Sequence, residues 1–246
     1  MIELTTPQWI IAVICALMIG FAKAGIPGSG ILIPLLAASI MPARESTGFV
    51  LPMLIMADML AIIYWRRFVE WKQLIRLLPW AWFGIFLGFL GMGHISNTLL
   101  RDFIGGLVLV LMLVSWLKDR VFSDNDISGH WLFAALLGTL AGSTSMMANA
   151  AGPVMVIYLV AMRLPKESFI GTSAWFFWLI NLSKLPFSHR LDLMNFQSLS
   201  ANLVLLPCIA AGGIIGIFIV KRISQKKFNT VVQILAAGAS IFLIFT

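Results

Sequence analysis

Charged residues are scarce in this chain. They make up 11% of its 246 residues, whereas 60% of the residues are hydrophobic and the mean hydropathy is +0.98. Soluble domains carry about 25% charged residues, so the composition excludes a soluble globular protein. We predict an all-α polytopic membrane protein, with residues 1–246 forming a single transmembrane domain in the lipid bilayer.

Cysteine and histidine are rarer still. The two cysteines, Cys15 and Cys208, both fall in apolar segments without metal-ligand spacing, which is typical of small buried residues. His94 stands at the end of an apolar segment and has no second His, Cys or carboxylate at metal spacing. We therefore expect no disulfide framework, no metal and no other cofactor.

Basic residues outnumber acidic ones, 17 to 10, and the pI is 9.9. The basic residues are spread over short loops between apolar runs, and no soluble basic domain exists to carry them. Nucleic acid is therefore not expected as a partner, and the excess charge is expected to report membrane topology. Besides two broken runs described next, the expected membrane spans are residues 47–65, 77–95, 103–117, 203–220 and 228–245.

The first apolar run, residues 8–41, is interrupted by AKAGIPGSG at residues 22–30. Glycine and proline free the backbone from helical bonding, so we expect a hairpin of two short arms. An arm of about 16 residues is roughly 24 Å long, shorter than the roughly 30 Å hydrocarbon core of a bilayer. The hairpin therefore either dips into the membrane and returns or crosses it fully, and both topologies stay open. Irregular backbone at membrane depth occurs where it is buried in protein or lines a cavity, which makes the break a candidate site.

The chemistry of this break favours an anion. The second arm is expected to begin at Pro27, with Ser29 as its cap and its N-terminal amides pointing into the break. A lysine in an apolar arm is costly unless an anion or a cavity meets it. The predicted donors are Lys23 for charge pairing and Gly28, Ser29 and Gly30 for amide and hydroxyl donation. The alternative is that Lys23 extends to a membrane interface and that the glycines only permit close packing.

A similar pattern returns in the second half of the chain. Residues 131–163 form another apolar run, broken by GSTSMMANAAGP at residues 142–153. The corresponding half-site is predicted to consist of Ser145, Asn149 and Gly152. The offset is 122 or 123 residues, and it aligns Gly142 with Gly20, Gly152 with Gly30, and Asn181 with Asp58.

The order of these features predicts two repeats, about 8–118 and 130–246, each a broken or re-entrant hairpin followed by three spanning helices. We counted the basic residues in the loops on each side of the membrane. One side receives three, Arg44, Arg101 and Arg190. The other side receives twelve: Arg66, Arg67, Lys72, Arg76, Lys118, Arg120, Arg163, Lys166, Lys221, Arg222, Lys226 and Lys227. The positive-inside rule then places both termini outside the cytoplasm. The second repeat enters from the opposite face, as in many secondary transporters, whose sites lie near the midplane.

Asp58 and Asn181 occupy matching positions in the two halves, and Lys184 follows Asn181 by three residues. An aspartate in a membrane helix is either a proton-coupling residue or the structural partner of a lysine, and both readings stay open. A proton or another ion is the expected coupling partner, and Asn181 joins the predicted binding residues. Trp175 and Trp178 precede Asn181 at helical spacing and either line the cavity or pack in the core.

GFAKAGIPGSGILIPLLA, residues 20–37, repeated loosely after Gly138, resembles the TauE/SafE family of membrane transporters, also called the sulfite exporter family. The resemblance covers essentially the whole chain. It implies a multi-pass carrier of the bacterial inner membrane, built from two homologous halves and associated with sulfite, sulfoacetate and related sulfur-containing anions. The second copy, NAAGP at residues 149–153, departs from the glycine-rich pattern.

These observations predict a secondary transporter of a small sulfur-containing anion, bound near the midplane between two broken-helix tips and moved by alternating access. One alternative is an enzyme similar to polyprenyl-phosphate phosphatases. The breaks contain Ser29, Ser143, Thr144 and Ser145 but no Glu or His to act as a base, so we expect no enzymatic activity. A passive anion channel and assembly into a homo-oligomer remain open.

Overall fold

The computed structural model describes residues 5–41, 43–92, 131–193 and 196–245. In this part of the chain the regular structure is entirely helical, which confirms the predicted all-α fold. The expected span 103–117 and His94 lie outside the described residues. The helices are α1 (Thr6–Ala24), η1 (Ser29–Ile31), α2 (Leu32–Ile40), α3 (Ala43–Trp65), η2 (Arg66–Phe68), α4 (Trp71–Gly91), α6 (Trp131–Ala148), α7 (Gly152–Ala161), α8 (Lys166–Arg190), α9 (Phe196–Arg222) and α10 (Gln225–Phe245).

Five stretches among the described residues are long and apolar enough to span a membrane: Thr6–Ala24, Glu45–Phe68, Trp71–Gly91, Trp131–Ala148 and Leu199–Arg222. The 25-residue helix α8 is not among them, because it carries hydroxyl residues, Asn181 and Lys184 within its length. Much of α8 is nevertheless buried. The polar helix therefore lies inside the protein, where neighbouring helices shield it from lipid.

Helix α4 begins earlier than the sequence predicts. The polar stretch 66–76 is expected to be a loop, but η2 and the first turns of α4 occupy most of it. Leu74 and Leu77 are each 1% exposed and face the core from these turns. Their burial explains why the helix extends into the polar segment, since an amphipathic face continues there.

The first hairpin returns to the side on which it starts. The Gln8 Nε2 atom donates a hydrogen bond of 3.0 Å to the carbonyl oxygen of Ile40, so the two ends of the hairpin lie at one level. At nine residues, α2 is about 14 Å long and too short to cross the bilayer. The predicted serine cap is wrong: Ser29 begins the 3-10 turn η1, its Oγ donates to Ile26 O at 2.8 Å, and α2 starts only at Leu32.

The second hairpin has the same proportions, with 18 residues in α6 and ten in α7. The break between the two helices turns at Asn149, whose φ of 52° lies in the left-handed region. Asparagine tolerates that region better than most residues. Pro153 stands in the first turn of α7, where its missing N–H costs nothing.

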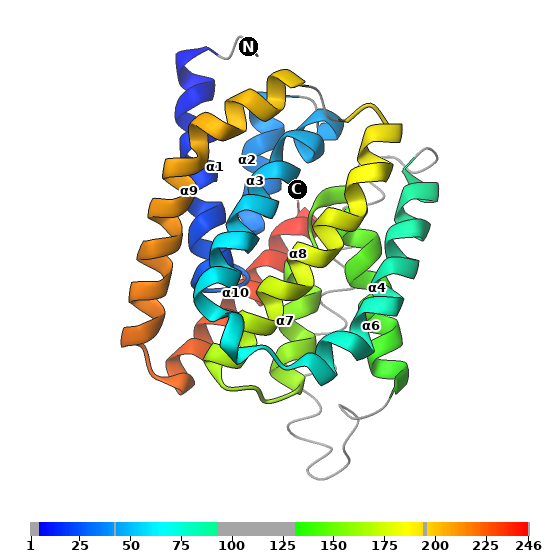
Figure 1. Cartoon of the computed structure of the whole chain (residues 1–246), viewed down its shortest axis with the longest axis vertical. Helices are drawn as coiled ribbons and strands as arrows, with labels where there is room; N and C mark the ends of the chain where they lie inside the picture. The colour runs from blue at the N-terminus through cyan, green and yellow to red at the C-terminus, as the bar shows by residue number, and fades with distance from the viewer. Residues whose placement is uncertain (1–4, 42, 93–130, 194–195, 246) are drawn as a thin grey trace.

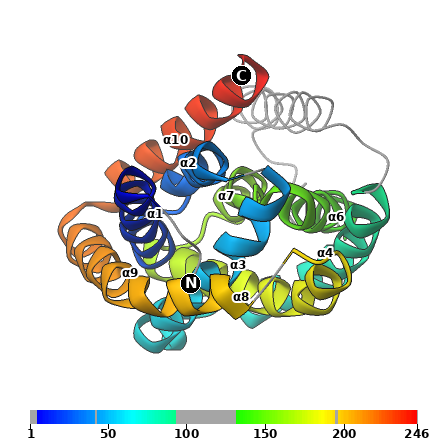
Figure 2. The same cartoon turned by 90° about the horizontal axis from the view of Figure 1, so that it is seen from above.

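Two helix pairs flank the molecule. Helix α1 lies beside α9 on one flank and α4 beside α6 on the other, with α3 and α8 between them (Figures 1 and 2). Glycines allow both pairs to approach at backbone distance. A Cβ atom at Gly20 or Gly142 would overlap the backbone of the neighbouring helix.

Substitution of Gly142 by alanine is expected to destabilise the α4–α6 pair by about 1 to 3 kcal/mol, the usual cost of overpacking. The new methyl group would overlap the carbonyl oxygen of Ala81 and lie 2.8 Å from the Ile85 nitrogen. Gly213→Ala is the matched control, because its Cβ would lie 3.6 Å from the Ala24 Cβ, an ordinary contact. Thermal unfolding in detergent compares the two variants, and equal melting temperatures would refute this account of the packing.

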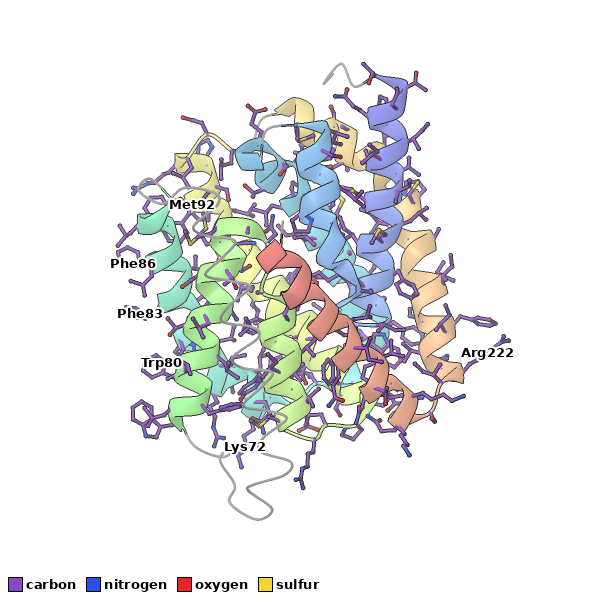
Figure 3. All side chains as sticks on the ribbon, turned by 180° about the vertical axis from the view of Figure 1, so that it is seen from behind. Lys72, Trp80, Phe83, Phe86, Met92 and Arg222 are labelled. Carbon is purple, nitrogen blue, oxygen red and sulfur yellow. The ribbon has the colours of Figure 1, made fainter. Side chains whose placement is uncertain are left out.

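The two ends of the helix bundle differ in charge. Figure 3 shows Lys72 and Arg222 at one end and Met92 toward the other. Phe83 and Phe86, 51% and 48% exposed, point outward from α4 as lipid-facing side chains do (Figure 3). The Lys72 end is formed by η2, by the first turns of α4, α8 and α10, and by the last turns of α7 and α9 (Figure 1). Basic residues are concentrated in or next to these turns: Arg66, Arg67, Lys72, Arg76, Arg163, Lys166, Lys221, Arg222, Lys226 and Lys227.

Candidate functional site

Helices α3 and α8 bring two matching polar residues together in the core. Asp58 and Asn181 are 0% and 1% exposed, and Asn181 Nδ2 donates to Asp58 Oδ2 at 2.8 Å. On α3, Asp58 lies between Ala57 and Ala61, which belong to two different hydrophobic clusters. The carboxylate is therefore surrounded by apolar packing and depends on polar partners for its stability.

Lys23, near the end of α1, supplies the charge that faces Asp58. Its Nζ lies 2.9 Å from Asp58 Oδ1, an oxygen that has no other partner among the described residues. The ammonium also lies 3.8 Å from the centre of the Phe177 ring, a distance typical of a cation–π contact. The Lys23 side chain is 13% exposed, so this end of the ion pair remains accessible.

Lys184, one turn beyond Asn181 on α8, binds the second hairpin. Its Nζ has three acceptors: Ser145 O at 3.1 Å, Ser145 Oγ at 3.0 Å and Asn149 Oδ1 at 2.6 Å. An ammonium group has three N–H donors, so this set satisfies the charged form of the lysine. All three acceptors are neutral, and the charge of Lys184 is not matched by a carboxylate of its own.

Asn149 holds the tip of the second hairpin in place. Its Nδ2 donates to Thr47 O in α3 at 3.1 Å, while its Oδ1 accepts from Lys184. Beside it, a Cβ atom at Gly152 would have no neighbour within 4 Å. The start of α7 therefore borders open space next to the Lys184 contacts, where its N-terminal amides favour an anion.

The tip of the first hairpin lies against other elements. A Cβ atom at Gly28, where φ is +93°, would lie 3.7 Å from Val156 in α7 and from Leu235 in α10. One at Gly30 would meet Ile33 and Ala22. Within the described part of the chain, no hydrogen bond or ion pair joins Gly28, Ser29 or Gly30 to Asp58 or Lys184. Two bonded groups lie one turn apart on α8: Asp58 with Lys23 and Asn181, and Lys184 with Ser145 and Asn149. Together these six residues are called the central polar cluster, and the three residues of the first hairpin tip lie outside it.

The sequence did not predict that Lys184 hydrogen-bonds to the second hairpin. The available signal was a lysine one turn after Asn181 in an otherwise apolar segment. Thr47 and Phe177 gave no signal, because a backbone carbonyl and a phenyl ring look ordinary in any membrane helix.

Trp175 and Trp178 pack against each other edge to face, with ring centres 5.7 Å apart, and Trp71 lies 5.2 Å from Trp175. Trp175 is also packed against the larger hydrophobic cluster, as the core reading predicts. The indole N–H groups of Trp175 and Trp178 are buried and lack acceptors in the described part of the chain.

The central polar cluster has the chemistry of an anion-binding site. It combines two ammonium groups, one from each half of the chain, with the neutral polar side chains of Ser145, Asn149 and Asn181 from the second half. It contains no histidine, thiol or second carboxylate, and the described residues hold no group of three or more metal-ligating side chains. Small anions such as sulfite or a sulfonate suit donors of this kind.

Comparison with known families gives a match to the sulfite exporter TauE/SafE family over residues 10–243, nearly the whole chain. No curated protein and no solved structure matches it. The family is one of membrane transporters, in agreement with the expectation that the protein is not an enzyme. The match confirms the resemblance seen in residues 20–37, and the chain belongs to the TauE/SafE sulfite exporter family.

Proposed function

We propose that this protein is a secondary transporter of a small sulfur-containing anion, sulfite or an organosulfonate, which binds at the central polar cluster. The observation that carries the proposal is the burial of two lysines, one from each half of the chain, in one polar region: Lys23 pairs with Asp58, and Lys184 holds the second hairpin one turn beyond Asn181, which binds the same aspartate. Ionisable groups inside membrane proteins usually mark the path of a substrate or ion. The family supports the choice of a sulfur anion.

The anion is proposed to bind beside Gly152, within reach of Lys184 and Lys23. Open space adjoins Gly152, the first residue of α7, and Lys184 meets the tip at Asn149. Lys23 Nζ pairs with Asp58 and faces the Phe177 ring, and its side chain is 13% exposed, so part of the ammonium group is open to a ligand. Ser145 and Asn181 complete the site, while Gly28, Ser29 and Gly30 are assigned to a neighbouring surface that the substrate passes.

Repeated contacts support the proposed inverted repeats of 8–118 and 130–246. In each half, glycines of one long helix touch carbonyl oxygens of the other half's hairpin. Leu17 and Thr139 are 122 positions apart, as are Phe21 and Ser143, and the offset is the one found in the sequence. Gly212 and Gly216 of α9 pack on Leu17 and Phe21 of α1. In the same way, Gly84 and Gly88 of α4 pack on Thr139 and Ser143 of α6.

Alternating access is proposed to use these glycine-packed pairs, α1 with α9 and α4 with α6, as rigid bodies. Backbone-to-backbone packing resists sliding, so each pair moves as one unit. Helices α3 and α8 lie between the pairs and carry Asp58 and Asn181. A rocking motion around the central polar cluster would then expose it to each side in turn, the mode typical of inverted repeats.

The membrane is proposed to be the bacterial inner membrane, with both termini outside the cytoplasm. The concentration of basic residues at the Lys72 end of the bundle supports this orientation, because cytoplasmic loops are enriched in Lys and Arg. Accessibility labelling of single cysteines placed at Gln225 and Ser39 in intact cells distinguishes the two orientations.

Substitution of Lys23 by methionine is expected to reduce anion transport by about tenfold or more, since a charge-assisted contact to the substrate is lost. Efflux of radiolabelled sulfite or methanesulfonate from proteoliposomes measures the effect. Lys72→Met is the matched control, because Lys72 is an exposed lysine at the basic end of the molecule. Wild-type flux in a correctly inserted Lys23→Met protein would remove Lys23 from the site.

The same proteoliposomes separate a carrier from a passive channel. A carrier that exposes one site alternately shows saturable flux and counterflow, in which unlabelled anion on one side drives labelled anion uphill from the other. Flux that rises linearly with concentration and gives no counterflow would favour the channel.

A further inference from the structure

Few charged side chains lie deep in the helix bundle in the described part of the chain. Among the described residues, Lys23, Asp58 and Lys184 are the charged side chains of the central polar cluster. The expected span at residues 103–117, FIGGLVLVLMLVSWL, contains no ionisable residue in its sequence. Among the described residues, these three side chains are therefore the charges to be counted at the proposed site.

Their signs do not cancel. Asp58 is matched by Lys23 at 2.9 Å, and its second oxygen accepts from the neutral amide of Asn181. Lys184 is bonded to the hydroxyl and carbonyl of Ser145 and the amide of Asn149, all of them neutral. With both lysines protonated and the aspartate ionised, the central polar cluster carries one unmatched positive charge, located at Lys184.

We propose that this single unmatched charge makes the transporter select monoanions, such as a simple sulfonate or hydrogensulfite, over dianions of similar size. The inference rests on the proposed function, because it assigns the substrate charge at the same site. A monoanion brings the buried cluster to neutrality. A dianion leaves one uncompensated negative charge in a low-dielectric surrounding, which is strongly unfavourable.

Asp58 is the residue that sets this preference. Removal of its charge by Asp58→Asn leaves two lysines and a cluster charge of two, which suits a dianion. Lys23→Met leaves Lys184 and Asp58, which cancel, so anions of both charges should bind weakly. The double variant Lys23→Met/Asp58→Asn removes the ion pair as a unit and returns the cluster to a single positive charge.

Methanesulfonate and sulfate are suitable probes, because both are tetrahedral sulfur oxyanions and they differ by one unit of charge. We expect purified wild-type protein to bind methanesulfonate at least about tenfold more tightly than sulfate in titration calorimetry. In Asp58→Asn the ratio should move toward sulfate by about tenfold or more. The double variant should recover part of the methanesulfonate binding that Lys23→Met loses, with a ratio close to that of wild type.

The outcomes separate this inference from the proposed function. If wild-type protein binds and transports no small anion of either charge, the proposed function fails. If it binds both probes with equal affinity, or if Asp58→Asn keeps the wild-type ratio, the charge rule is overturned while the transporter proposal stands. Should Asp58→Asn not fold, the comparison of Lys23→Met with the double variant decides the matter, and failure of the double variant to recover methanesulfonate binding contradicts the rule.

Discussion

Replacement of Lys184 by methionine is expected to reduce sulfite or sulfonate transport by up to about 100-fold. Lys184 carries the unmatched positive charge of the central polar cluster and lies beside the open start of α7. Because its three N–H groups are already bonded within the protein, Lys184 acts on the substrate through its charge. Two unit charges about 6 Å apart attract by about 3 kcal/mol at an effective dielectric constant of about 20, and every 1.4 kcal/mol corresponds to a factor of about ten. Radiolabelled flux in proteoliposomes, normalised to the amount of inserted protein, measures the loss.

Two controls make this result specific. Lys226→Met removes an exposed lysine from the basic end of the bundle and should leave flux unchanged. Lys184→Arg keeps the charge but changes the donor geometry, so it should retain more flux than Lys184→Met. If Lys184→Met inserts normally and transports at the wild-type rate, the cation at the second hairpin has no part in substrate binding.

Substitution of Asp58 by asparagine is expected to abolish the dependence of transport on an imposed pH gradient. Asp58 is 0% exposed and touches Lys23 from the first hairpin and Asn181 from the second half of the chain. A proton on this carboxylate would remove the charge that holds Lys23 and so loosen the contact between the first hairpin and α3. Asparagine keeps the shape of the side chain but cannot take up or release that proton.

The measurement is anion flux with and without a pH difference across the proteoliposome membrane. Wild-type flux should respond to the gradient, and Asp58→Asn flux should be the same in both conditions. Asp192→Asn serves as control, because Asp192 is an exposed carboxylate at the end of α8. Persistent coupling in Asp58→Asn would leave Asp58 as a purely structural partner of Lys23.

The helical architecture was predictable because it depends on composition and on local breaks. Clusters of glycine and proline such as those within residues 22–30 and 142–153 favour the end of a helix, and the structure breaks the chain within both stretches. The exact start of α2 was not predictable, because the chain first forms a 3-10 turn in which Ser29 bonds to Ile26. The same local sequence is compatible with a 3-10 turn and with an earlier start of the α-helix.

The positions of the buried polar residues were predictable from the sequence, and their pairing was not. Lys23, Asp58, Asn181, Ser145 and Asn149 stand out as polar residues in apolar segments. The structure places Lys23 and Asn181 on Asp58, and Ser145 and Asn149 on Lys184. Which lysine pairs with the aspartate depends on how α1, α3 and α8 cross, and such long-range geometry leaves no local trace. The sequence therefore assigned Lys23 to the substrate, whereas the structure pairs it with Asp58 and leaves the charge of Lys184 unmatched.

The bond between Asp58 and Asn181 illustrates the limit. The two residues occupy matching positions, separated by 123 residues. Residues related by a two-fold axis meet only if they lie on that axis, and the offset alone does not locate the axis. Their hydrogen bond is what the proposed inverted repeat requires if its axis passes between α3 and α8.

Location of a bound anion by anomalous diffraction tests the central claim most directly. The probe is 2-bromoethanesulfonate, a monoanion whose bromine is visible by its anomalous signal. The account predicts one bromine peak inside the molecule, next to Gly152 and between Lys23 and Lys184, and no such peak in Lys184→Met. A peak confined to the basic end around Lys72, with the central polar cluster empty in crystals that bind the anion, would contradict it.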